Sequence, residues 1–169
     1  EARIAREFHG LANGERVAVG DIEIESVPVN HSLPGACGYL IHTPRGVIAY
    51  TGDLRFHGYE GYLSTAFMQR AAACKPIALI CEGTRIDQQK EGPGERDVQE
   101  KVAAVVKKTK NLVIANYPWK DIERLRSFHE VAKATGRKLA LNLKQAYLLE
   151  YLKGSDAGAP SLDDASIVI

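Results

Sequence analysis

The 169-residue sequence has little of what marks several protein classes. Its three cysteines, Cys37, Cys74 and Cys81, lack the CxxC spacing of common zinc and redox motifs. We therefore expect unpaired, mostly buried thiols and a reducing, cytoplasmic location. The sequence has no apolar run of about 18 residues, so no membrane span is expected. It also shows no secretory signal.

The sequence also has no large excess of positive or of negative charge. The formal net charge is +1, so no global basic field marks a nucleic-acid-binding protein, and such a role would need a local groove. A glycine-rich phosphate loop of the Walker or Rossmann type is absent. The composition, 45% hydrophobic and 25% charged, is that of an ordinary globular chain. The length allows one domain, or one domain and part of another.

The first part of the chain is rich in predicted antiparallel strands. Alternating apolar residues predict hairpins over 15–29 and 38–51, with turns at Gly20-Asp21 and Pro44-Arg45-Gly46. A helical pattern follows over 62–74. The continuous apolar run at 76–81 predicts a strand buried on both faces, with Cys81 in the core.

The pattern changes at residue 95, after a polar, glycine-rich loop over 85–94. From there, predicted helices at 95–108, 119–135 and 144–152 alternate with predicted strands at 112–115, 139–143 and 167–169. Such alternation is typical of a parallel sheet built from crossovers. The sequence therefore predicts an α/β fold with an α+β first part, divided into domains at 1–94 and 95–169. Because it starts without Met and stops within a predicted strand, we expect a fragment.

Two polar residues follow neighbouring predicted strands. His31 comes after the apolar residues 27–29, and Asp53 comes after 47–50 and Gly52, which permits a close backbone approach. One hairpin separates them, so both side chains return to the same sheet edge. An imidazole and a carboxylate are groups that a hydrolytic metal centre needs. The simpler alternatives are a loop histidine and a turn-capping aspartate.

These motifs resemble a known family. Residues 30–38 (Asn-His-Ser-Leu-Pro-Gly-Ala-Cys-Gly) and 50–53 (Tyr-Thr-Gly-Asp) resemble the third and fourth metal-binding motifs of the metallo-β-lactamase superfamily. They are most similar to its β-CASP branch of RNA-processing nucleases, which includes ribonuclease J and the cleavage-and-polyadenylation endonuclease. Residues 78–84 resemble the acidic motif that leads into the β-CASP domain, and 111–138 resemble the opening of that domain.

The resemblance implies the C-terminal half of a metallo-β-lactamase domain followed by the start of a β-CASP domain. It implies that His31 ligates one zinc ion and that Asp53 bridges two. It also implies that Glu82 is a carboxylate that either orients a ligating histidine or acts in the active site itself. The implied activity is two-metal hydrolysis of RNA. The main ligand motif of the family, His-x-His-x-Asp-His, is absent. We therefore expect this segment alone to bind zinc weakly or not at all, and to be inactive.

Other residues are weaker candidates. His57 is a candidate catalytic residue that could face a substrate phosphate, although a surface loop histidine is the simpler interpretation. Candidate substrate-binding residues are Arg55 in the same loop, Thr84 after a strand end, and Trp119 and Lys120 before a helix N-terminus that favours anions. A turn at Thr84 and a packing role for Trp119 are the structural alternatives. We expect His129 to be solvated on a helix face.

Two other functions stay open. One is a small-molecule ester or thioester hydrolase of the same superfamily, although the βαβ pattern after residue 95 counts against it. The other is a non-catalytic α/β binding module in which His31 and Asp53 are structural. A homodimer through exposed strand edges is a further possibility.

Overall fold

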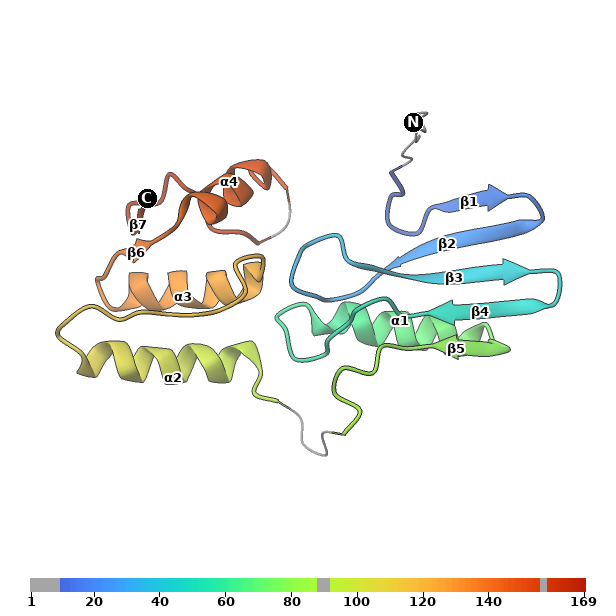
Figure 1. The fold of residues 1–169 in the computed structure, drawn as a ribbon, viewed down its shortest axis with the longest axis horizontal. Coiled ribbons are helices and arrows are strands. Elements are labelled where there is room, and N and C mark those ends of the chain that lie inside the picture. Colours follow the sequence, from blue (N-terminus) through green and yellow to red (C-terminus); the bar gives the residue numbers. More distant parts are fainter. Residues whose placement is uncertain (1–9, 88–91, 156–157) are drawn as a thin grey trace, which may run out of the picture.

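The computed structural model describes residues 10–87, 92–155 and 158–169, in which seven strands and four helices are arranged in two parts (Figure 1). The elements of the first part are β1 (Arg16–Val19), β2 (Ile22–Pro28), β3 (Cys37–Thr43), β4 (Gly46–Tyr50), α1 (Gly61–Ala73) and β5 (Ala78–Ile80). Those of the second part are α2 (Glu95–Lys108), α3 (Ile122–Ala134), β6 (Leu139–Ala140), α4 (Leu143–Tyr151) and β7 (Ile167–Val168).

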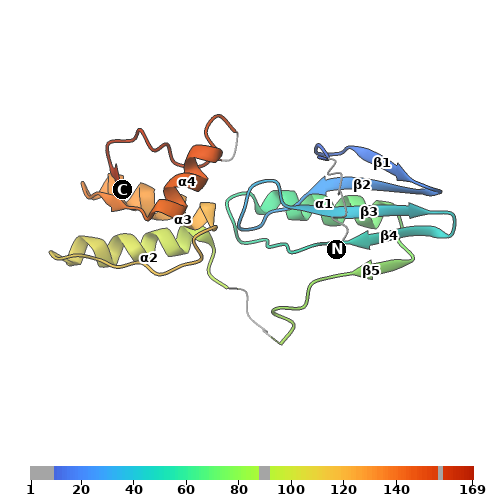
Figure 2. The same cartoon turned by 45° about the horizontal axis from the view of Figure 1, so that its top comes forward.

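The first part is a five-stranded sheet in the order β1-β2-β3-β4-β5. The first four strands are antiparallel, as the hairpin patterns predict, and β5 joins β4 in parallel after α1. Helix α1 lies along one face of the sheet (Figures 1 and 2). Phe67 and Ala71 of α1 pack there against Val27, Leu40 and Ala49, which form the core of this part.

The prediction of a fully buried strand at 76–81 is wrong. Strand β5 is the edge of the sheet, and its residues Leu79 and Ile80 are about half exposed. Cys81, predicted to be in the core, is exposed as well. Among the described residues only α1 covers the sheet, so an apolar run alone does not show whether a strand is covered on both faces.

Three strands of this sheet have their C-terminal ends at the same edge, which is formed by strand ends and not by the outermost strand β5. Because β2 and β4 are both antiparallel to β3, and β5 is parallel to β4, strands β2, β4 and β5 run in one direction. The loops that follow β2 and β4 lie on the side of the sheet that faces α3 (Figure 1). This edge positions the candidate site.

The second part consists of three helices and the short parallel pair β6-β7. Its core joins α3, α4 and β7 through Ile122, Leu125, Leu149 and Ile167, together with Leu141, which directly follows β6. Helix α3 has apolar residues at helical spacing, as the sequence indicates, and Gly136 follows it with φ +66°. The helix begins at Ile122, three residues later than predicted.

Two further predictions about this part are wrong. Residues 112–115 form no strand, and Leu112 and Ile114 are more than 80% exposed, because no neighbouring strand pairs with them among the residues described. His129, expected to be solvated, is buried. Its Nε2 lies 3.3 Å from Oδ2 of Asp164, in the loop before β7, so this loop covers its helix face.

The predicted α/β fold class, with an antiparallel first part and a parallel strand pair in the second, is confirmed. The domain boundary between residues 94 and 95 stays a prediction, and residues 88–91 of the loop before it lie outside the described residues. Within the described ranges, no helix is long and apolar enough to span a lipid bilayer.

Candidate functional site

The edge where β2, β4 and β5 end carries the three residues of the predicted site. His31, Asp53 and Glu82 each follow one of these strands. The first two loops are directly joined, because the backbone N–H of Arg55 donates to the carbonyl of Asn30 over 2.8 Å. The residue before His31 thus contacts the residue two positions after Asp53, as expected from the single hairpin between them.

The loop of Glu82 is joined to the same edge through Thr51. The Thr51 N–H donates to the carbonyl of Ile80 over 3.0 Å, and the Glu82 N–H donates to the Thr51 hydroxyl over 3.3 Å. Thr84, predicted to bind substrate, donates from its hydroxyl to Oε2 of Glu82 over 2.5 Å. Thr84 therefore orients the Glu82 carboxylate in this structure.

Gly52 holds the Asp53 loop close to β3. Its φ is +57°, a conformation that disfavours residues with a Cβ. A Cβ at this position would lie 2.8 Å from the carbonyl oxygen of Cys37. The close approach expected from the Thr-Gly-Asp sequence is therefore present.

The described residues do not form a complete metal centre. No group of three or more His, Cys, Asp and Glu side chains converges among them. His31 is half-buried and Asp53 is exposed, and together they supply one imidazole and one carboxylate. Because catalytic zinc sites use at least three protein ligands, these two residues alone do not fit a zinc centre. Their roles as ligands stay a prediction.

His57 lies where the first part of the chain meets α2. Its carbonyl accepts a hydrogen bond from the N–H of Glu95, the first residue of α2, over 3.1 Å. Partial burial, together with the positive charges of Arg55 and Arg85, lowers the pKa of His57 below its ordinary 6.5. The neutral imidazole that results is able to accept a proton, which is compatible with the predicted catalytic role.

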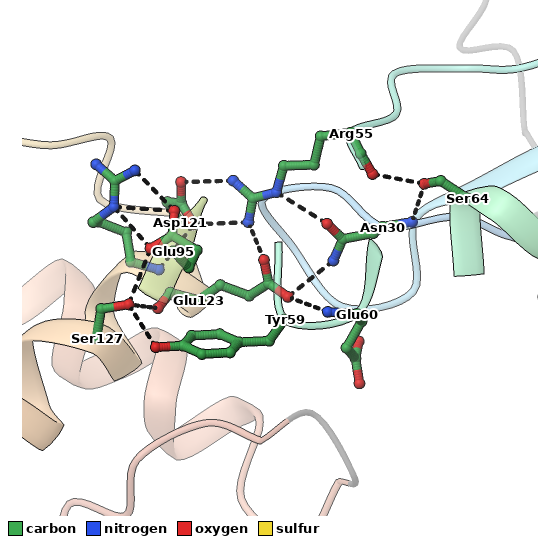
Figure 3. Close-up of polar contacts among 10 residues, drawn as sticks. Asn30, Arg55, Tyr59, Glu60, Ser64, Glu95, Asp121, Glu123 and Ser127 are labelled. Carbon is green, nitrogen blue, oxygen red and sulfur yellow. Dashed lines mark hydrogen bonds and ion pairs between the residues drawn. The ribbon is translucent and has the colours of Figure 1, made fainter. Parts of the chain in front are cut away.

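Arg55 joins the two parts of the chain (Figure 3). Its guanidinium forms two hydrogen bonds to Asp121, of 3.0 and 3.1 Å, and one to Glu123 of 2.7 Å. It also donates from Nε to Oδ1 of Asn30 over 3.2 Å. These contacts account for the side chain without a substrate, so its position favours a structural role over the predicted substrate contact.

The predicted anion site before α3 is already occupied by a carboxylate. Asp121 caps the helix and accepts a hydrogen bond from the N–H of Arg124 over 3.1 Å. The Lys120 ammonium lies 5.3 Å from the centre of the Trp119 ring, so these two side chains contact each other. Their roles in substrate binding stay predictions.

A pocket of about 470 Å³ lies between the two parts. His31 lines it, together with Asn30 and Ser32 from the first part and Glu123 and Arg126 from α3. Asp53 and Glu82 are not among its lining residues. Of the three edge residues, His31 alone therefore faces this space.

Sequence reasoning missed three residues that organise this region: Asn30, Asp121 and Glu123. Asp121 could have been identified, because an Asp directly before an apolar helical pattern is a common N-cap. Asn30 lies beside His31 within the recognised motif. Nothing local in the sequence marks the contact between Arg55 and Glu123, which are 68 residues apart.

No family model matches the chain. Curated relatives do: the chain is 30% identical over 131 residues to a ribonuclease J of Sinorhizobium meliloti, a match that covers 76% of this chain and 23% of the relative. It is 26% identical over 167 residues to ribonuclease J of Mycobacterium tuberculosis, covering 93% of this chain and 30% of the relative. The chain thus spans between about a quarter and a third of the length of these relatives.

A solved structure shares the fold. A protein of unknown function from Enterococcus faecalis aligns with a TM-score of 0.70 and 30% identity, over 91% of this chain and 37% of the other. The match to the Mycobacterium tuberculosis ribonuclease J covers 93% of this chain and therefore includes the segments with the His31 and Asp53 motifs. The chain belongs to the ribonuclease J-like, β-CASP branch of the metallo-β-lactamase superfamily.

Proposed function

We propose that the chain is part of a metal-dependent ribonuclease that hydrolyses RNA phosphodiester bonds. The observation that carries this proposal is the shared edge of β2, β4 and β5, where hydrogen bonds join the loops of His31, Asp53 and Glu82. The relatives named ribonuclease J support RNA as the substrate. The proposed activity is that of the full-length protein that carries these residues.

We further propose that His31 and Asp53 are two of the ligands of a two-zinc centre. The remaining ligands have to come from outside the described residues, because these contain no third converging ligand. His31 and Asp53 would hold such a centre together with these further ligands, and its chemistry would be to polarise a phosphodiester and to supply a hydroxide. We propose that Glu82, which accepts a hydrogen bond from the Thr84 hydroxyl, orients a ligating group. The 169 residues alone are proposed to be inactive.

The test compares variants of the full-length protein in an RNA degradation assay. We expect His31→Ala and Asp53→Ala to reduce the rate by about a hundredfold or more, since each removes a metal ligand. Asp21→Ala is the matched control, because Asp21 is an exposed aspartate in the turn between β1 and β2. It should leave the rate unchanged.

Full activity in the His31 and Asp53 variants would contradict the proposal. Hydrolysis of small esters or thioesters by the wild-type protein, without RNA cleavage, would favour the small-molecule hydrolase instead. A wild-type protein that binds neither metal nor RNA would favour a non-catalytic module.

A further inference from the structure

Arg55 is the centre of a buried cluster of charges. The side chains of Arg55, Asp121 and Glu123 are 10%, 9% and 12% exposed. The cluster therefore consists of one guanidinium between two carboxylates.

The carboxylate of Glu123 accepts hydrogen bonds from uncharged groups as well as from Arg55. Glu123 accepts hydrogen bonds from Arg55, from the side-chain amide of Asn30 over 2.9 Å and from the N–H of Glu60 over 3.0 Å (Figure 3). Asp121 accepts from Arg55 and from the N–H of Arg124. Each carboxylate thus accepts several hydrogen bonds from the protein itself. The donors and acceptors of the cluster are therefore paired with one another and do not serve an exchangeable ligand.

The cluster connects the first turn of α3 to both candidate loops. Asn30 precedes His31, and Arg55 lies two residues after Asp53. The N–H of Ile122, the first residue of α3, also donates to the carbonyl of Ser32 over 3.0 Å. Helix α3 therefore contacts the residues on both sides of His31 as well as the loop of Asp53.

Helix α1 holds the same two loops from the other side. The Ser64 hydroxyl, fully buried, donates to the carbonyl of Arg55 over 2.8 Å and accepts from the N–H of Asn30 over 3.0 Å. Gly58 leaves the space for the cluster, because a Cβ there would lie 2.1 Å from Oε2 of Glu123 and 2.2 Å from Oδ1 of Asn30.

Helix α3 is itself anchored to α2. Arg124 pairs with the buried Glu95 through an Nη2–Oε1 distance of 2.8 Å, and Ser127 donates to the same carboxylate over 3.0 Å. The second part of the chain can therefore act as a rigid support for the two loops.

We propose that Arg55, Asp121 and Glu123 form a positioning lock, through which α3 fixes the His31 loop relative to the Asp53 loop. Its importance for catalysis rests on the proposed function, but the lock itself does not. Arg55 is a positioning residue here: it acts through the loops and touches no reacting atom. The spacing of the two predicted metal ligands thus depends on a helix more than 60 residues further along the chain.

The lock is tested by hydrogen–deuterium exchange in the full-length protein, with two variants that leave Arg55 in place. Glu123→Gln puts an amide where three donors converge, and Gly58→Ala inserts a methyl group into the cluster. We expect amide exchange over residues 30–34 and 53–57 to become about tenfold faster or more, because local opening costs less free energy.

Two matched control variants distinguish faster exchange in these loops from a general loss of stability. Glu130→Gln lies on the same helix at an exposed position, and a Cβ at Gly10 meets nothing within 4 Å. Neither Glu130→Gln nor Gly10→Ala should change exchange in the two loops. Unchanged loop exchange in folded Glu123→Gln would overturn the lock, and this variant decides the test if Gly58→Ala does not fold.

A kinetic measurement links the lock to the proposed activity. In the full-length protein, Glu123→Gln should lower kcat for RNA by about tenfold or more while KM changes by less than about threefold, since Glu123 serves to position the loops and not to bind substrate. An unchanged kcat together with faster exchange would show that the lock does not serve catalysis. A wild-type protein without ribonuclease activity would contradict the proposed function but leave the exchange result valid.

Discussion

Among single residues, Arg55 has a large expected effect on stability. Replacement by Met leaves Asp121 and Glu123 buried without their cation, and breaking a buried ion pair from one side costs about 3–5 kcal/mol. Urea unfolding of the full-length protein measures this loss. Lys153→Met is the control, because its pair with Asp163 is mostly exposed and solvent screening leaves it little effect on stability. Equal losses in the two variants would contradict the buried cluster.

Gly52 offers a second test at this scale. Gly52→Ala combines a positive φ with a contact to the Cys37 carbonyl, whereas Gly20→Ala has a positive φ of +64° in open space. Since the positive φ alone costs about 1–2 kcal/mol, Gly20→Ala should lose about that much and Gly52→Ala clearly more. Thermal unfolding measures both. A smaller loss at Gly52 would show that the Asp53 loop does not lie against β3.

His57 predicts a pH dependence. Because its pKa is lowered in the folded state, the unfolded chain takes up the proton first as the pH falls. The stabilisation is therefore present above pH 6.5 and is lost as the pH falls through the folded-state pKa. His57→Gln should reduce the loss of stability between about pH 7.5 and about pH 5.5, measured by urea unfolding. An identical pH profile would contradict the burial of this imidazole.

Among the elements, α3 has two separable roles, as a capped helix and as the anchor of the lock. Asp121→Asn keeps a capping side chain but removes the charge, and Asp121→Ala removes both. Asn142→Ala at the start of α4 removes a cap alone and should cost about 1 kcal/mol. We expect thermal unfolding to show larger losses for both Asp121 variants. A loss equal to that of Asn142→Ala would contradict the pairing with Arg55.

Most elements follow from local patterns in the sequence. The two hairpins and all four helices are predicted, since turns at Gly20 and Gly46 and apolar residues at helical spacing are local signals. Whether a strand is covered depends on residues that lie far from it in the sequence. Strand β5 has the composition of a buried strand but lies at an exposed edge of the sheet. For the same reason, the apolar residues 112–115 predicted a strand that has no partner in the described part of the chain.

In the candidate site, too, the residues in local motifs are predictable from the sequence, whereas the contacts between distant residues are not. His31 and Asp53 were found because each follows a strand in a short recognisable motif. The lock was not found, because Arg55 and Asp121 are 66 residues apart and only the packing of α3 against the sheet edge brings them together. Arg55 consequently resembled a phosphate-binding residue in the sequence, whereas its charge is used within the fold.

At the scale of the whole molecule, the two parts meet where the candidate loops lie (Figure 1). The sheet supplies His31 and Asp53, and α3 supplies the acidic residues that hold their loops. A metal centre at this edge needs further ligands from outside the described residues. For the full-length protein we therefore propose that His31 and Asp53 are ligands in a shared two-metal site.

Metal analysis of the purified full-length protein tests this claim most directly. If Asp53 is a ligand of both ions, we expect about two zinc ions per wild-type molecule and less than about one in Asp53→Asn, since an amide is a weaker metal ligand than a carboxylate. Asp21→Asn, the exposed control, should keep the wild-type content. A full metal complement in Asp53→Asn would contradict the account.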